Sequence, residues 1–144
     1  MRVNTQHFFE IHVYVAQVDV GWTEKDAENQ MDLIHAEVIG LVRAQNGHTN
    51  PNWVSLVFTD RTVEEGPLKI GAMAYLHEMF PLLATVNDGV GRQNVREAIA
   101  AMLRGGLSYN KFVYEHQVTD FQKNSPVIFV AGAGSDARGR TFGQ

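Results

Sequence analysis

Hydrophobic positions alternate with mixed ones from residue 7 to residue 20, which is the period-two pattern of a β-strand. One row is apolar and consists of Phe9, Ile11, Val13 and Val15. The other row is mixed and contains Phe8, Glu10, His12 and Tyr14. We therefore expect one long strand, with the apolar row on the core and the mixed row on the opposite face.

From residue 27 the apolar spacing changes to steps of three and four, which places these side chains on one stripe of a helix. The stripe consists of Ala27, Met31, Ile34, Val38, Leu41 and Val42. Residues 23–26 form a capping-box variant, with Asp in place of the usual Glu or Gln, and predict that the helix starts at Thr23. Asn46-Gly47 is expected to close the helix, because both residues tolerate the left-handed backbone conformation.

Two further apolar runs, 53–60 and 68–80, predict a pair of strands. The first run alternates, with one side formed by Val54, Leu56 and Phe58. The connection 61–67 is rich in turn formers and short, so the two strands should pair as an antiparallel hairpin. Pro81 is expected to end the second strand or to confine it to a sheet edge, because proline has no backbone N–H.

Residues 87–91 contain Asn-Asp-Gly and a second glycine, and they form the clearest breakpoint in the chain. Beyond it, Asn94 should cap a second helix that runs to Arg104 and ends at Gly105-Gly106. The apolar stripe of this helix consists of Val95, Ile99, Met102 and Leu103. Two more strands are expected over residues 111–116 and 127–130.

These elements predict an α+β fold, with a mostly antiparallel sheet and two helices packed on one face. A chain of 144 residues fits a single domain. We assign residues 1–130 to this domain. Residues 131–144 are rich in Gly, Ala and Arg and are expected to form a flexible C-terminal arm.

Composition narrows the possible functions. The chain has no cysteine, which excludes disulfides and thiolate metal sites. Its formal net charge of −4 is opposite to the basic stripe of a duplex-binding protein. The first residues lack the apolar segment of a signal peptide, and no apolar run is long enough to cross a bilayer. We therefore expect no association with a membrane.

Residues 131–137 follow the apolar run 127–130 and imitate the glycine-rich fingerprint of dinucleotide-binding folds. That motif needs a following helix, whose N-terminus binds the pyrophosphate. Only seven residues follow Ala137, so no such helix is expected. The arm is the better interpretation, and we predict no nucleotide cofactor.

One helix flank carries Glu28, Asp32 and His35 at steps of four and three. Such a row could bind a metal ion. However, a metal site needs converging ligands, and no matching ligand set occurs on the second helix. A solvated flank is the better interpretation, and we predict no metal.

Glu10, His12 and Tyr14 share a strand face, where a glutamate and a histidine could form a general-base pair. No nucleophile motif, oxyanion loop or second acid lies nearby in the sequence. A hydrogen-bonded pair at a subunit contact or on a hydrated sheet face is therefore expected. His77 and Glu78 are adjacent on one strand and should point to opposite faces, so they do not form one site. We predict no catalytic residue and hence no enzyme.

Residues 8–86 resemble the tail terminator proteins of long-tailed phages. The resemblance depends on the order of three elements: the strand 9–15, the helix 27–42, and the hairpin formed by 53–60 and 68–80. It implies a ring, usually a hexamer, that caps the finished tail tube and joins it to the neck. The implied partners are other copies of the chain, the tail tube protein and a neck or connector protein. Viral DNA would pass through the lumen without specific binding, and the protein would belong to the virion after assembly in the host cytoplasm.

Members of that family usually open with a helix and strands, and the unit described above follows. Here the helix–strand–strand segment 94–130 comes last instead, so joining Gln144 to Met1 would restore the family's order. This hypothesis of a rotated order predicts that the two halves share one sheet and that the chain ends lie close together. The alternatives are another neck, connector or tube-like subunit, or a small α+β enzyme or ligand-binding domain that uses Glu10 and His12.

Two sets of residues are candidates for contacts within such a particle. The first is an acidic set facing the lumen or a partner, namely Asp60, Glu64 and Glu65. Negative charge in a lumen would keep DNA from adhering, although a solvated turn is the plainer interpretation. The second set lies in the arm and would order on a neighbouring subunit: Arg138, Arg140 and Phe142. Unpaired strand edges are candidate seams between subunits.

Overall fold

The computed structural model describes residues 4–17, 23–45, 50–59, 63–70, 73–87 and 89–138, and for residues 63–69 and 135–138 it describes the backbone alone. The strands are β1 (Asn4–Ala16), β2 (Ser55–Phe58), β3 (Val63–Ile70), β4 (Met73–Asn87), β5 (Val113–Tyr114) and β6 (Val127–Arg138). The helices are α1 (Glu24–Arg43), which follows β1, and α2 (Arg92–Gly106), which follows β4.

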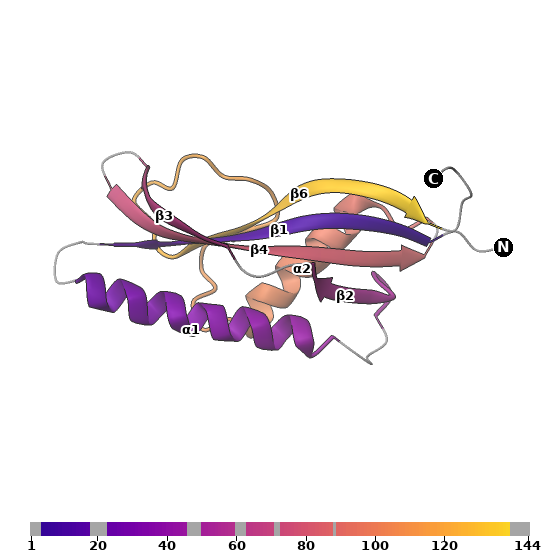
Figure 1. Ribbon diagram of the computed structural model, residues 1–144, viewed down its shortest axis with the longest axis horizontal. Coiled ribbons are helices and arrows are strands. Elements are labelled where there is room, and N and C mark those ends of the chain that lie inside the picture. The colour runs from indigo at the N-terminus through magenta and orange to yellow at the C-terminus, as the bar shows by residue number, and fades with distance from the viewer. Residues whose placement is uncertain are drawn as a thin grey trace.

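The strands form one sheet in the order β2-β4-β1-β6-β5, and β3 also pairs with β4. All pairings are antiparallel except that of β5 with β6, which is parallel. Figure 1 shows the long strands β1, β4 and β6 side by side, with both helices on one side of the sheet. The predicted α+β class, with a mostly antiparallel sheet and two helices on one face, is therefore confirmed.

The main core lies between the helices and one face of the sheet, which we call the helix face. The strands contribute Phe9, Ile11, Val13 and Val15 from β1, Phe80 and Leu82 from β4, and Ile128 and Val130 from β6. The helices contribute Met31, Ile34 and Val38 from α1, and Val95, Ile99 and Leu103 from α2. The alternation in β1 and most of both helical stripes are therefore buried as predicted. Leu41 and Met102 are only partly buried at the edge of this core.

The opposite side of the sheet, which we call the second face, has a smaller aromatic core. Phe121 packs edge-on against Tyr14 and Tyr75, with ring centroids 4.8 and 5.2 Å apart. The Tyr75 hydroxyl donates a hydrogen bond of 3.0 Å to the carbonyl of Asn124. The Ala16 N–H donates one of 2.8 Å to the Ser125 hydroxyl. These contacts hold the segment 115–126 between β5 and β6 over part of the second face.

Helix α1 starts where its capping box predicts. The Thr23 N–H donates a 2.8 Å hydrogen bond to the Asp26 carboxylate, and the Asp26 N–H donates one of 3.3 Å to the Thr23 hydroxyl. The hydrogen bonds that the carboxylate accepts from the Thr23 backbone and hydroxyl lower the pKa of Asp26. The predicted end of the helix is wrong, because α1 ends at Arg43 with Ala44 as its C-cap. Asn46-Gly47 lies outside the described residues.

The predicted hairpin of 53–60 with 68–80 is wrong in its pairing. The antiparallel hairpin is β3 with β4, so the predicted turn 61–67 contains paired strand residues and the predicted strand 68–80 is divided between β3 and β4. Strand β2 instead pairs with the far half of β4, with Ser55 opposite Thr85. Val54 precedes β2 and is 58% exposed, so it does not join the apolar side with Leu56.

Pro81 lies within β4 and does not end it. Its carbonyl accepts a hydrogen bond of 3.1 Å from the Thr59 N–H, on the side of β4 away from β1. The N–H and C=O of a strand residue point to the same side, so the missing N–H of proline also lies there. At this point the β3 pairing has ended at Met79, and the β2 pairing starts at Leu82. Proline therefore falls in the gap between two partners, where no ladder donor is required.

The second half of the chain also departs from its predicted bounds. Gly91 is the N-cap of α2 and makes no side-chain hydrogen bond, so Asn94 is not the cap. Strand β5 is shorter than predicted, and β6 continues to Arg138 instead of ending at residue 130. The flexible arm predicted over 131–144 is therefore wrong for residues 131–138, which belong to β6 and pair with β1. Residues 139–144 lie outside the described part.

Strand β1 connects the two halves of the chain in one sheet. It pairs with β4 on one side and with β6 on the other. Its first residue, Asn4, lies opposite Arg138, the last residue of β6. The start of β1 and the end of β6 consequently meet at one end of the molecule, on the right in Figure 1.

Candidate functional site: a polar chain on the second face

Three polar side chains form a hydrogen-bonded chain across β1 and β4 on the second face. Glu10 and His12 come from β1, where alternation turns both away from the helix face. His77 comes from β4 and lies opposite Tyr14 in the register. The pairing of β1 with β4 therefore brings His77 next to His12, although 65 positions separate them in the sequence.

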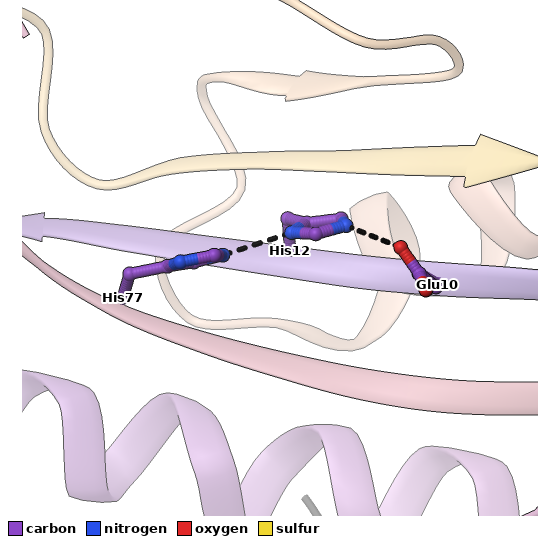
Figure 2. A network of polar contacts seen from close by, with 3 residues as sticks. All are labelled: Glu10, His12 and His77. Atoms are coloured by element: carbon purple, nitrogen blue, oxygen red, sulfur yellow. Dashed lines mark hydrogen bonds and ion pairs between the residues drawn. The ribbon is translucent and has the colours of Figure 1, made fainter. Parts of the chain in front are cut away.

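The polar chain of Glu10, His12 and His77 has a defined geometry, which Figure 2 shows from close by. His12 Nε2 lies 2.9 Å from Glu10 Oε1, and His12 Nδ1 lies 2.8 Å from His77 Nε2. The planes of the two imidazole rings differ by 16°, with their centroids 5.0 Å apart. The rings thus meet edge to edge, which suits an in-plane hydrogen bond between nitrogens.

The acceptor at one end of the chain determines where the protons lie. An ionised carboxylate can only accept, so His12 must donate to Glu10 through its Nε2–H. In a neutral His12 the other nitrogen, Nδ1, is then an acceptor, and it takes a hydrogen bond from the Nε2–H of His77. The carboxylate of Glu10 therefore fixes which ring nitrogen of His12 carries the proton, as in other carboxylate–histidine pairs.

Aromatic rings hold both imidazoles in place. The His77 ring stacks on Tyr14 at 4.1 Å with an angle of 5° between the planes, and the His12 ring stacks on Phe129 at 4.9 Å. His77 is 3% exposed, whereas the side chains of His12 and Glu10 are 15% and 35% exposed. The chain therefore runs from a buried end at His77 to a partly hydrated end at Glu10.

This arrangement can position a proton but does not by itself make a catalytic centre. A carboxylate that orients a histidine is part of general-base sites. A catalytic site also needs a nucleophile or a substrate atom within hydrogen-bond reach of the base. His12 uses both ring nitrogens within the chain. The predicted hydrogen-bonded pair of Glu10 and His12 is confirmed, with His77 as a third member.

The predicted flank of α1 does not converge into a site. His35 Nδ1 lies 2.7 Å from Glu78 Oε1 of β4, whereas Glu28 and Asp32 are exposed. Glu78 is on the helix face and His77 on the second face, so the prediction that these neighbours point apart is confirmed. Within the described residues, no three or more histidine or acidic side chains are arranged to hold a metal ion.

The glycine-rich run that imitates a nucleotide fingerprint has a structural explanation in β6. A Cβ atom at Gly132 would lie 2.8 Å from an Arg96 guanidinium nitrogen, so α2 packs closely beneath the strand. Gly134 has a φ of +123°, and it follows a bulge where the pairing with β1 shifts between Phe8 and Phe9. The glycines thus serve helix packing and the bulge.

The predicted partner-facing residues are only partly placed. Glu64 and Glu65 belong to β3 and lie opposite Glu78 and His77 in the register, so they are not in a turn as predicted. Arg138 ends β6. Asp60, Arg140 and Phe142 lie outside the described residues.

Within the described part of the chain, no helix has the length and apolar character needed to cross a membrane.

His77 is the member of the polar chain that the sequence did not place in the site. Its separation from His12 is large, and the strand that carries it was expected to pair with residues 53–60 and not with β1. A usable signal was the alternation itself, since His77 lies on the face opposite to the apolar residues Leu76 and Phe80.

No family model, curated protein or solved structure matches this chain.

Proposed function

We propose that this chain is a structural subunit of a phage tail, a terminator whose copies close into a ring that caps the tail tube and joins it to the neck. Viral DNA passes through the lumen of this ring. The proposal assigns no reaction to the subunit. Glu10, His12 and His77 then serve the integrity of the sheet and are not a catalytic centre.

The observation that supports this proposal best is the pairing of β1 with β6, with Asn4 opposite Arg138. Both halves of the chain share one sheet, and the end of β6 lies beside the start of β1. From α2 through β5 and β6 into β1, the order is helix and strands, followed by β1, α1, β2 and a hairpin, which is formed by β3 and β4 and not by 53–60 and 68–80. That is the order of elements that the resemblance implies for tail terminators. Because the start of β1 and the end of β6 are adjacent, such a rotation is possible without loss of the sheet.

The sheet also offers edges at which copies can join. Along β6, the pairing with β5 covers only Ile128 and Phe129, so among the described strands residues 131–138 have a partner on the β1 side alone. At the other side of the sheet, β4 is the one partner that β3 has among the strands that the structure describes. Two different free edges on one subunit allow a head-to-tail contact, which closes into a ring when the rotation per subunit permits.

The acidic and arginine-containing residues complete the proposal. Asp60, Glu64 and Glu65 would face the lumen or a neighbouring protein, and like charge would reduce adhesion of DNA. Arg138, Arg140 and Phe142 would contact the neighbouring subunit. A neck, connector or tube-like ring subunit is the closest alternative, because it would use the same edges with a different partner.

The test is the assembly state of the purified chain, measured by native mass spectrometry and electron microscopy with and without tail tube protein from the same genome. We expect a ring of several copies, usually six, or addition of the chain to one end of the tubes. Binding to connector protein but not to tubes would favour the neck subunit. A chain that stays monomeric at high concentration with both partners would refute the proposal.

A pair of variants tests the β6 edge as a seam. Ala133→Lys places a charge on the exposed part of β6, and Ala101→Lys places the same charge on the exposed side of α2. Lysine on an edge strand opposes pairing with a further strand. We expect Ala133→Lys to reduce ring formation and Ala101→Lys to leave it unchanged. Equal behaviour of the two variants would place the seam elsewhere.

A further inference from the structure

We infer that the polar chain of Glu10, His12 and His77 is sensitive to acid. Its hydrogen bonds persist when it takes up one proton and break when it takes up a second. Breaking them weakens the contacts that hold the segment 115–126 on the second face and so favours its opening. This inference depends on the contacts within one subunit and not on the proposed function.

The proton limit follows from the 2.8 Å contact between His12 Nδ1 and His77 Nε2. Only one proton fits between two nitrogens at hydrogen-bond distance. His12 already carries a proton on Nε2, which it donates to Glu10. One added proton leaves a single imidazolium, and the contact persists with either ring as the donor. When both rings are cationic, two N–H groups face each other and the contact breaks.

Among the described residues, the elements that pack against the pair place the following charged or titratable groups near it. On β1 they are Glu10 and the Tyr14 hydroxyl, and on β3 the residue opposite His77 is Glu65. Strand β6 contributes Phe129 and no charge at this point. The contact of the covering segment with this cluster is Phe121 on Tyr14. The charged or titratable residues of that segment are Glu115, His116, Asp120 and Lys123.

The polar chain is connected to the segment through aromatic rings. His77 stacks on Tyr14, and Tyr14 packs against Phe121 of the segment. Tyr75, which also contacts Phe121, donates to the Asn124 carbonyl. If His77 moves away from His12, Tyr14 loses its nearest stacking partner and keeps Phe129 at 5.7 Å, so Phe121 loses part of its support. The open state then accepts the second proton that the closed state excludes, so acid favours opening.

Amide hydrogen exchange of residues 115–126 between pH 7.5 and pH 4.5, corrected for the intrinsic rate, tests this inference. Opening is coupled to the uptake of one proton. Below the pH at which the pair takes up its second proton, the corrected exchange rate should therefore rise about tenfold for each unit by which the pH falls. His77→Gln should remove this rise, since an amide can donate to or accept from His12 without titrating. His116→Gln, on an exposed residue of the same segment, should keep it. Glu65→Gln should keep the rise as well, which would exclude protonation of the Glu65 carboxylate as its cause.

A nitrogen NMR spectrum of the imidazoles gives a readout that does not depend on opening. At pH 7.5 we expect a protonated Nε2 on both His12 and His77. A corrected exchange rate that is flat with pH would overturn the inference. So would the same acid response in His77→Gln as in the unmodified chain, or an unprotonated Nε2 on His12.

Discussion

Gly105 and Gly106 are neighbours in the last turn of α2, but a methyl group meets different surroundings at the two positions. A Cβ atom at Gly105 has nothing within 4 Å. A Cβ atom at Gly106 would lie 2.9 Å from Leu41 Cγ and 2.7 Å from Leu41 Cδ1, and it would be closer still to Cδ2. Leu41 belongs to α1, so the missing side chain at 106 allows the two helices to approach.

The two alanine substitutions should therefore change stability in opposite directions. Gly105→Ala gains helix propensity alone and should stabilise the protein by about 0.5–1 kcal/mol. Gly106→Ala has the same gain, but it forces Leu41 out of its place, and overpacking of this kind costs about 1–3 kcal/mol. We expect a net destabilisation of about 0.5–2 kcal/mol for Gly106→Ala. For a protein of this size, that is a fall in Tm of about 1–8 °C.

Urea unfolding of both variants, followed by circular dichroism, measures these changes. The Leu41→Ala background provides the control, because it removes the atoms that the new methyl group would meet. In that background Gly106→Ala should become neutral or stabilising, and the double-mutant cycle should give a coupling of about 1–3 kcal/mol. If Gly106→Ala stabilises the unmodified chain as much as Gly105→Ala does, the close approach of α1 and α2 is wrong.

Two other contacts give predictions of their own. Thr23→Ala removes the N-cap of α1 and should destabilise the protein by about 1 kcal/mol, measured by urea unfolding, and an unchanged midpoint would contradict the cap. Because the pKa of Asp26 is lowered by folding, its carboxylate stabilises the folded state above the unfolded value of 3.8, and this contribution is lost as the pH falls through the folded pKa. Asp26→Asn should flatten the pH dependence of thermal stability in that acid range, and an unaltered profile would refute the assignment. His35→Ala leaves the mostly buried Glu78 carboxylate without its 2.7 Å partner and should cost about 1–3 kcal/mol at pH 7, whereas the exposed-site control Asp32→Ala should change stability little.

The elements with strong local signals were predicted well. The start of α1 is fixed by contacts between Thr23 and Asp26, three positions apart, and these contacts are visible in the sequence. The apolar stripe of each helix and the alternation in β1 reflect the side chains that are removed from water on folding. These patterns are also local, because they repeat every two to four residues. The class of the fold and the hydrogen-bonded pair of Glu10 and His12 were therefore accessible before the structure.

The pairing of the strands was decided by tertiary structure. Pro81 looks like a strand end, and it is tolerated inside β4 only because the β3 pairing ends before it and the β2 pairing starts after it. Residues 131–138 look like an arm, and they form a strand because β1 offers them a long partner and Gly132 leaves room for the Arg96 side chain of α2. Neither condition can be read from the local sequence.

The sequence by itself determined the two helices and β1 and which of their faces are apolar, because those properties arise from side chains a few positions apart. Only the tertiary structure decided that β1 lies between β4 and β6, since strand pairing is a choice among distant partners with similar local preferences. That choice brings His77 to His12 and Asn4 to Arg138. Both the polar chain and the meeting of the two halves of the chain depend on it.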